Sequence, residues 1–129
     1  MNKATIYALP LARLLLSILF LVAGYGKLMN PAGTIAYISS AGLPLPQLGY
    51  VIALAAELGG GLLILVGYQT RIIAPLMALF TLATAVCFHN NFADQSQLMS
   101  FLKDIAIAGG FLALMVSGAG ICSIDNRKA

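Results

Sequence analysis

The sequence predicts an all-α integral membrane protein, in which four transmembrane helices form an antiparallel bundle and a short interfacial or re-entrant helix joins the first two. Its composition is the first observation: of 129 residues, 60% are hydrophobic, only 9% are charged, and the mean hydropathy is +0.95. Soluble domains carry about 25% charged residues, so too few are present here to cover a surface that faces water. The lengths of the apolar runs and of the links between them supply the other two observations.

Each apolar run is long enough to cross a bilayer, which takes about 20 residues in a helix. The expected spans cover about 4–28, 48–68, 72–89 and 101–119, within one transmembrane domain over residues 1–129. The links after the second and third spans are short, which favours antiparallel neighbours. We expect the first run to be a permanent helix rather than a cleaved signal peptide, because Arg13 interrupts its apolar centre and no clear cleavage site follows.

The connection between the first two spans, residues 29–47, has its own helix signals. Asn30 is a suitable N-cap, Pro31 stands at the first helical position, and Gly42 is a suitable C-cap before a proline-rich stop. We therefore expect a short helix packed over one end of the bundle, with an ordinary ordered loop as the alternative.

An even number of spans places both termini on one side of the membrane. The basic residues expected on that side are Lys3, Arg71, Arg127 and Lys128, and the charged residues expected opposite are Lys27, Asp94 and Lys103. The positive-inside rule then favours cytoplasmic termini. The net charge of +3 comes from scattered residues, without the basic block that is typical of nucleic-acid binding.

Two charged residues fall inside apolar spans. At about 1.5 Å per residue, Arg13 lies roughly 10 Å inside its helix, and Glu57 lies roughly 15 Å from either end of its own. A charge that faces lipid costs about 2.5 kcal/mol or more. We therefore expect both to face inward and to form an ion pair, which either belongs to a functional site or only specifies how the helices pack. The expected inward stripes are Arg13, Ser17, Phe20, Gly24, Lys27 and Tyr50, Ala53, Glu57, Gly60, Ile64, with Gly59, Gly60 and Gly61 allowing close helix approach.

A second polar group is expected at the outer ends of the spans, from Lys27, His89, Lys103 and Asp104. Asp104 is the natural partner of Lys27 or Lys103, and Lys103 begins an inward face of small residues (Ala106, Gly110, Ala113, Ser117). Such a mouth can hold a small anion or donate to a quinone carbonyl, with His89 exchanging protons near neutral pH. Alternatively, the lysines only extend to the interface, and His89 is an interfacial hydrogen-bonding residue. One histidine without a nearby cysteine argues against a metal or haem site, and Cys87 and Cys122 are expected to be free thiols.

Several motifs, taken together, resemble the DoxX family of small bacterial four-helix inner-membrane proteins. They are Arg13 with Phe20 and Gly24-Tyr25-Gly26-Lys27-Leu28, Glu57-Leu58-Gly59-Gly60-Gly61 with Gly67 and Arg71, Phe88-His89-Asn90-Asn91-Phe92, Phe101-Leu102-Lys103-Asp104 with Gly109-Gly110-Phe111-Leu112, and Ser117-Gly118-Ala119-Gly120 before Ser123-Ile124-Asp125. The order and spacing of these motifs cover nearly the whole chain. One departure is Asp104, where the family often has asparagine; its charge would neutralise Lys103.

The resemblance implies an accessory subunit of a membrane redox system, linked to quinone and to sulfur metabolism, whose own catalysis stays open. The residues themselves offer no intrinsic cofactor site, and quinone is the expected ligand. The expected partners are the lipid bilayer, a membrane or redox protein, or further copies of the chain. The candidate site residues are Arg13, Glu57, Lys27, His89, Lys103 and Asp104. Two alternatives remain: an oligomeric transporter of protons or small solutes that uses Glu57, and a scaffold without chemistry.

Overall fold

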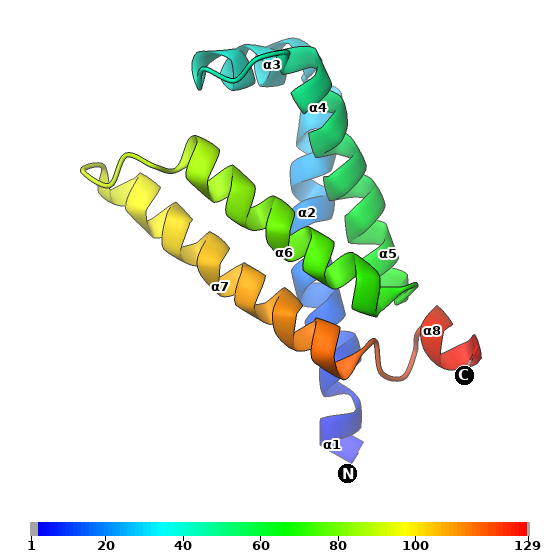
Figure 1. Ribbon diagram of the computed structural model, residues 1–129. Helices are drawn as coiled ribbons and strands as arrows, with labels where there is room; N and C mark the ends of the chain where they lie inside the picture. The colour runs from blue at the N-terminus through cyan, green and yellow to red at the C-terminus, as the bar shows by residue number, and fades with distance from the viewer. Residues whose placement is uncertain (1–2, 129) are drawn as a thin grey trace.

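Figure 1 shows the computed structural model, which describes residues 3–128. The helices form two hairpins that cross each other. The first hairpin consists of α1 (Lys3–Ile6) and α2 (Ala8–Met29), followed by α4 (Pro46–Leu54), the π-helix η1 (Ala55–Gly60) and α5 (Gly61–Val66). The second consists of α6 (Thr70–Phe88) and α7 (Gln95–Ser117), which pack along their lengths. The two remaining helices are α3 (Pro31–Ser40) and α8 (Ile124–Lys128).

The four expected spans are confirmed, with shifted ends. The helices long and apolar enough to cross a membrane are Lys3–Met29, Pro46–Val66, Thr70–Phe88 and Gln95–Ser117. The last begins at Gln95 rather than at Phe101, because Asp94 caps it: the Asp94 side chain accepts a hydrogen bond from the backbone N–H of Ser96 at 3.0 Å. Because the first turn of this helix is polar, hydropathy alone places the start of the span too late in the sequence.

The short helix in the first connection is also confirmed. The Asn30 side chain accepts a hydrogen bond from the backbone N–H of Gly33 at 3.2 Å, and Pro31 is the first helical residue. The helix ends at Ser40, and Gly42 follows with a φ of +82°, a conformation that favours glycine. Figure 1 shows α3 lying across the end of the molecule opposite to both termini.

The core lies where the two hairpins cross. Phe20 of α2 and Phe111 of α7 pack with ring centroids 5.6 Å apart, and Ile64 of α5 is fully buried beside them. Gly61 has Leu21 against it, since a Cβ there would lie 3.2 Å from the Leu21 Cδ2. Gly60 likewise faces Met77 of α6, whereas Gly59 faces open space. Two of the three consecutive glycines therefore allow the close helix contacts that the sequence predicts.

The outer faces of the helices are apolar and exposed, as a lipid environment requires. Leu15, Val22, Leu79 and Val116 are each between 61% and 71% exposed. Inward, the stripe of α2 is confirmed, because its buried residues are Arg13, Ser17, Phe20 and Gly24. The stripe of the second span is confirmed at Glu57, Gly60 and Ile64, which are all buried.

Candidate functional site

Arg13 is buried as expected, but the predicted Arg13–Glu57 ion pair is wrong. The Arg13 side chain is surrounded by backbone carbonyls instead, and the residue is only 1% exposed. Its Nε donates to the Ala119 carbonyl at 2.9 Å and its Nη1 donates to the Leu65 carbonyl at 2.7 Å. Further hydrogen bonds reach the carbonyls of Ile64 at 3.4 Å, Ile121 at 2.9 Å and Cys122 at 2.8 Å.

The direction of helical side chains explains this outcome. Side chains on a helix lean toward its N-terminus, so Arg13 extends toward the end of the molecule that holds the termini. Glu57 lies toward the opposite end of the molecule. It precedes Leu65, whose carbonyl binds Arg13, by eight residues, which is about 12 Å along the helix. Carbonyls at the C-terminal end of a helix, such as that of Leu65 in α5, carry partial negative charge and can stabilise the guanidinium. The carbonyls of Ala119, Ile121 and Cys122, in the segment after α7, complete its surroundings.

The surrounding segment is shaped to fit the guanidinium. Gly67 ends α5 with a φ of +71°, and a Cβ at this position would lie 2.9 Å from the Arg13 Nη1. The Asp125 carboxylate accepts hydrogen bonds from the backbone N–H groups of Gln69 at 2.7 Å and Thr70 at 2.8 Å, at the start of α6. Arg13 thus attaches the C-terminal segment to α2, and Asp125 attaches it to the start of α6. These contacts indicate a structural role for this cluster.

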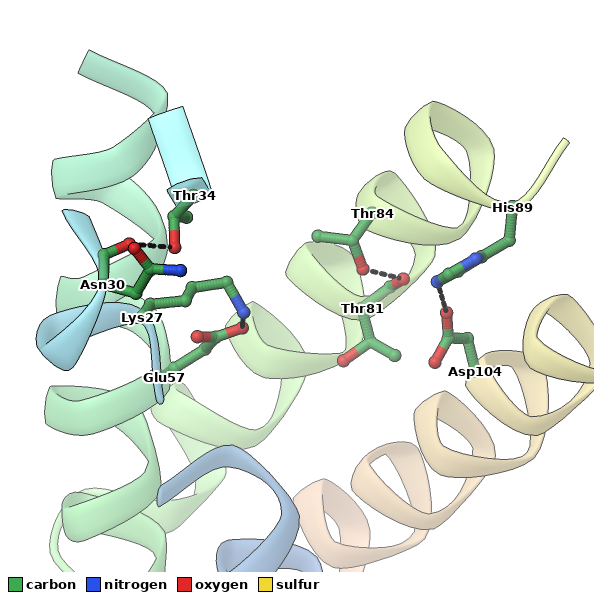
Figure 2. Close-up of polar contacts among 8 residues, drawn as sticks. All are labelled: Lys27, Asn30, Thr34, Glu57, Thr81, Thr84, His89 and Asp104. Atoms are coloured by element: carbon green, nitrogen blue, oxygen red, sulfur yellow. Dashed lines mark hydrogen bonds and ion pairs between the residues drawn. The ribbon is translucent and has the colours of Figure 1, made fainter. Parts of the chain in front are cut away.

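Glu57 pairs with Lys27 rather than with Arg13. The Lys27 Nζ donates to the Glu57 Oε1 at 2.9 Å (Figure 2), and the two side chains are 31% and 9% exposed. The second carboxylate oxygen, Oε2, is buried and has no hydrogen-bond partner among the described residues. The Tyr50 hydroxyl donates to the Lys27 carbonyl at 3.0 Å, which links the end of α2 to α4.

Glu57 lies within η1, where the backbone is wound as a π-helix. A π-helical turn widens the helix locally and occurs often at functional sites. This turn was not among the features expected from the sequence, although three consecutive glycines follow Glu57-Leu58 and weaken the local preference for an α-helix.

The predicted partners of Asp104 are also wrong. The Asp104 Oδ2 lies 3.9 Å from the His89 Nε2, at the other side of the site (Figure 2). Lys103 is exposed, and so are Ala106, Ala113 and Ser117 of the stripe expected to face inward. The buried face of α7 is instead formed by Ala108, Phe111 and Leu114. The alanines and glycines on this helix are small and do not determine which face is buried. Phe111 and Leu114 bury more apolar surface, and they set the orientation of α7.

Four of the six predicted residues line one cavity of about 330 Å³, whose walls come from both hairpins and from α3. We call it the inter-hairpin cavity; its lining includes Phe20, Tyr37, Phe80 and Phe88, together with Lys27, Glu57, His89 and Asp104. Tyr37 of α3 stacks on Phe88 of α6 with ring centroids 5.3 Å apart, so α3 is attached to the second hairpin. Arg13 and Lys103 do not line the cavity.

Three threonines that were not among the predicted site residues line the same cavity. Thr34 comes from α3, and Thr81 and Thr84 come from α6. Thr81 and Thr84 are three residues apart on one helix and therefore lie next to each other on one face. This spacing is the sequence pattern that could have identified them as a pair. The volume and the mostly apolar lining with a few polar groups are typical of small-molecule sites.

Comparison with known proteins gives a consistent result. A family model described as DoxX matches residues 8–90. "Inner membrane protein YqjF" of Escherichia coli is 46% identical over 99% of this chain and 99% of its own, and "Inner membrane protein YphA" of the same organism is 36% identical over 92% and 89%. "Putative oxidoreductase CatD" of Bacillus subtilis is 43% identical over 61% of this chain and 58% of its own. No solved structure matches significantly.

Proposed function

The chain belongs to the DoxX family of membrane proteins, and from this premise we propose that it is an accessory subunit of a bacterial inner-membrane redox system that holds a quinone ring in the inter-hairpin cavity. The ring would lie among the aromatic side chains, with a partner protein as the source or acceptor of electrons. Two relatives are named as inner-membrane proteins and one as a "Putative oxidoreductase", which supports the setting of this proposal.

The observation that carries the proposal is the combination of an apolar, aromatic cavity with the Lys27–Glu57 ion pair and the neighbouring His89 and Asp104. Phe20, Phe80 and Phe88 supply flat apolar surface for a ring, and the cavity lies within a protein whose outer surface is suited to lipid, where quinones dissolve. Lys27 keeps two N–H donors beyond the one that it shares with Glu57, and these can polarise a ring carbonyl.

Co-purification and binding test this function. The protein is purified in a mild detergent, its bound lipid is extracted into organic solvent, and quinones are quantified by their absorbance. Decylubiquinone should also raise the midpoint of thermal unfolding, as any ligand of the folded state does. Absence of quinone from the extract together with an unchanged midpoint would refute the proposal.

A matched pair of variants locates the binding. Lys27→Gln should weaken decylubiquinone binding by about tenfold, the loss expected for a charge-assisted hydrogen bond. Lys103→Gln removes the same charge from an exposed position outside the cavity, and binding should be unchanged. Equal losses in both variants would mean that the ring does not lie beside Lys27.

We also propose that both termini are cytoplasmic. Figure 1 shows the two termini at one end of the molecule, and the residues at this end include Lys3, Arg71 and Arg127. The positive-inside rule favours the cytoplasm for such an end. A reporter that fluoresces only in the cytoplasm should therefore be active when it is fused to the C-terminus, and a reporter that acts only in the periplasm should be inactive there.

A proton or solute path is the second candidate, because Glu57 is a buried carboxylate near the middle of a span and one of its oxygens has no partner among the described residues. Purified protein in liposomes tests this candidate through proton flux. Glu57→Gln should abolish any flux that uses the carboxylate, and flux that is equal in the two proteins would refute this path.

A further inference from the structure

The hydrogen-bonding capacity of the inter-hairpin cavity is unequal, with more acceptors than donors. All three threonines that line it have already used their single hydroxyl hydrogen on a backbone carbonyl. Thr34 donates to Asn30 at 2.9 Å, Thr81 donates to Met77 at 2.7 Å and Thr84 donates to Thr81 at 2.9 Å (Figure 2 draws the first and the last). Toward a ligand, these hydroxyl groups therefore present acceptor lone pairs only.

The two carboxylates add to this excess. Glu57 accepts one hydrogen bond, from Lys27, although a carboxylate has about four acceptor positions. The Asp104 carboxylate accepts no hydrogen bond among the described residues, since His89 lies 3.9 Å away, beyond hydrogen-bonding distance. Figure 2 shows the two carboxylates on either side of the threonines of α6.

The donors in the cavity are fewer, and two of them stand beside a negative charge. Lys27 is paired with Glu57, and His89 lies near Asp104. The remaining donor is the hydroxyl group of Tyr37, a residue that is 55% exposed. With neutral histidine, the single positive charge of Lys27 stands against the two negative charges of Glu57 and Asp104.

The two redox forms of a quinone differ in how they fit such a lining. The oxidised ring carries two carbonyl oxygens, which only accept hydrogen bonds and are repelled by a carboxylate. The reduced ring carries two hydroxyl groups, and each can donate to a carboxylate or to a threonine oxygen. A charge-assisted O–H donor to a carboxylate is among the stronger hydrogen bonds in proteins.

We propose that the inter-hairpin cavity selects the reduced, dihydroxy form of the ring over the oxidised form, with one hydroxyl group donated to the Glu57 carboxylate. This inference rests on the proposed function, because it names which form of the ligand the same site prefers. The buried Oε2 of Glu57, which lacks a partner among the described residues, shows that this carboxylate has acceptor capacity to spare.

Three probes with one carbon skeleton test the inference on the full chain in detergent: decylubiquinone, decylubiquinol, and the dimethyl ether of that quinol, which keeps the oxygens and lacks the donors. Dissociation constants are measured by anaerobic calorimetry. The quinol should bind about tenfold or more tightly than either other probe, the ratio expected for one charge-assisted hydrogen bond. Equal affinities, or tightest binding of the oxidised form, would overturn the inference and leave the proposed function standing. Absence of binding by all three would overturn both.

Variants identify the acceptor. Glu57→Gln replaces a charged acceptor with an amide that also donates, so the preference for the quinol should fall to about threefold or less, as expected for a neutral hydrogen bond. Asp104→Asn makes the same kind of change on the opposite wall and tests whether the Asp104 carboxylate contributes to the preference. Lys103→Gln is the control and should keep the preference of the unaltered protein. A preference that persists in full in Glu57→Gln would show that Glu57 is not the acceptor, and would refute the inference as stated. The three-probe comparison on the unaltered protein needs no variant to fold.

Discussion

The substitution Arg13→Met tests whether a buried guanidinium can be held by backbone carbonyls alone. Methionine keeps much of the apolar stem and removes hydrogen bonds to five carbonyls at 2.7 to 3.4 Å. One hydrogen bond to a charged group contributes about 1.5–3 kcal/mol, but neutral methionine also avoids the desolvation cost of the guanidinium. Because Arg13 is buried and its carbonyl partners lose their donor, at about 1–3 kcal/mol for each buried acceptor left unsatisfied, we expect a net loss of about 3–5 kcal/mol.

Reversible unfolding in mixed micelles measures this loss, and the chain offers a matched control. Arg71 also binds the end of a helix, donating to the carbonyls of Met115, Val116 and Ser117 of α7, but it is exposed. Arg71→Met should therefore cost about 1 kcal/mol or less, because water can replace these bonds. Equal costs for the two substitutions would refute the reasoning, since burial would then have no effect on the energy of the carbonyl contacts.

Three further predictions concern single positions and use the same unfolding assay. Gly67→Ala should cost about 2 kcal/mol or more, because its Cβ would collide with Ser123 and Arg13 in addition to the strain of a positive φ. Gly42→Ala, with positive φ and open space, should cost about 1 kcal/mol, and a smaller cost at Gly67 would contradict this. Gly24→Ala should destabilise, because its Cβ would lie 2.7 Å from Leu58, whereas Gly26→Ala on the same helix should be neutral or stabilising by up to about 1 kcal/mol. Asp94→Ala should remove the cap of α7 and cost about 1 kcal/mol, with Ser96→Ala, which keeps the backbone donor, as the milder control.

The spans, the inward stripe of α2 and the helix that begins at Asn30 are determined by the sequence itself. Each depends on a local property: the length of an apolar run, a helical period, or a capping residue followed by proline. Burial of Arg13 and Glu57 followed from the same kind of argument, because any charge at that depth must avoid lipid.

The partners of those charges were decided by the tertiary structure. The depth of a residue in its own helix does not say where a neighbouring helix begins, or which way a long side chain extends. Arg13 therefore meets the carbonyls that end α5, and Lys27 meets Glu57. The face of α7 was likewise set by packing, since Phe111 contacts Phe20 and turns Lys103 outward. Local pattern determines that a polar group is buried, but only the relative placement of four helices determines what it binds.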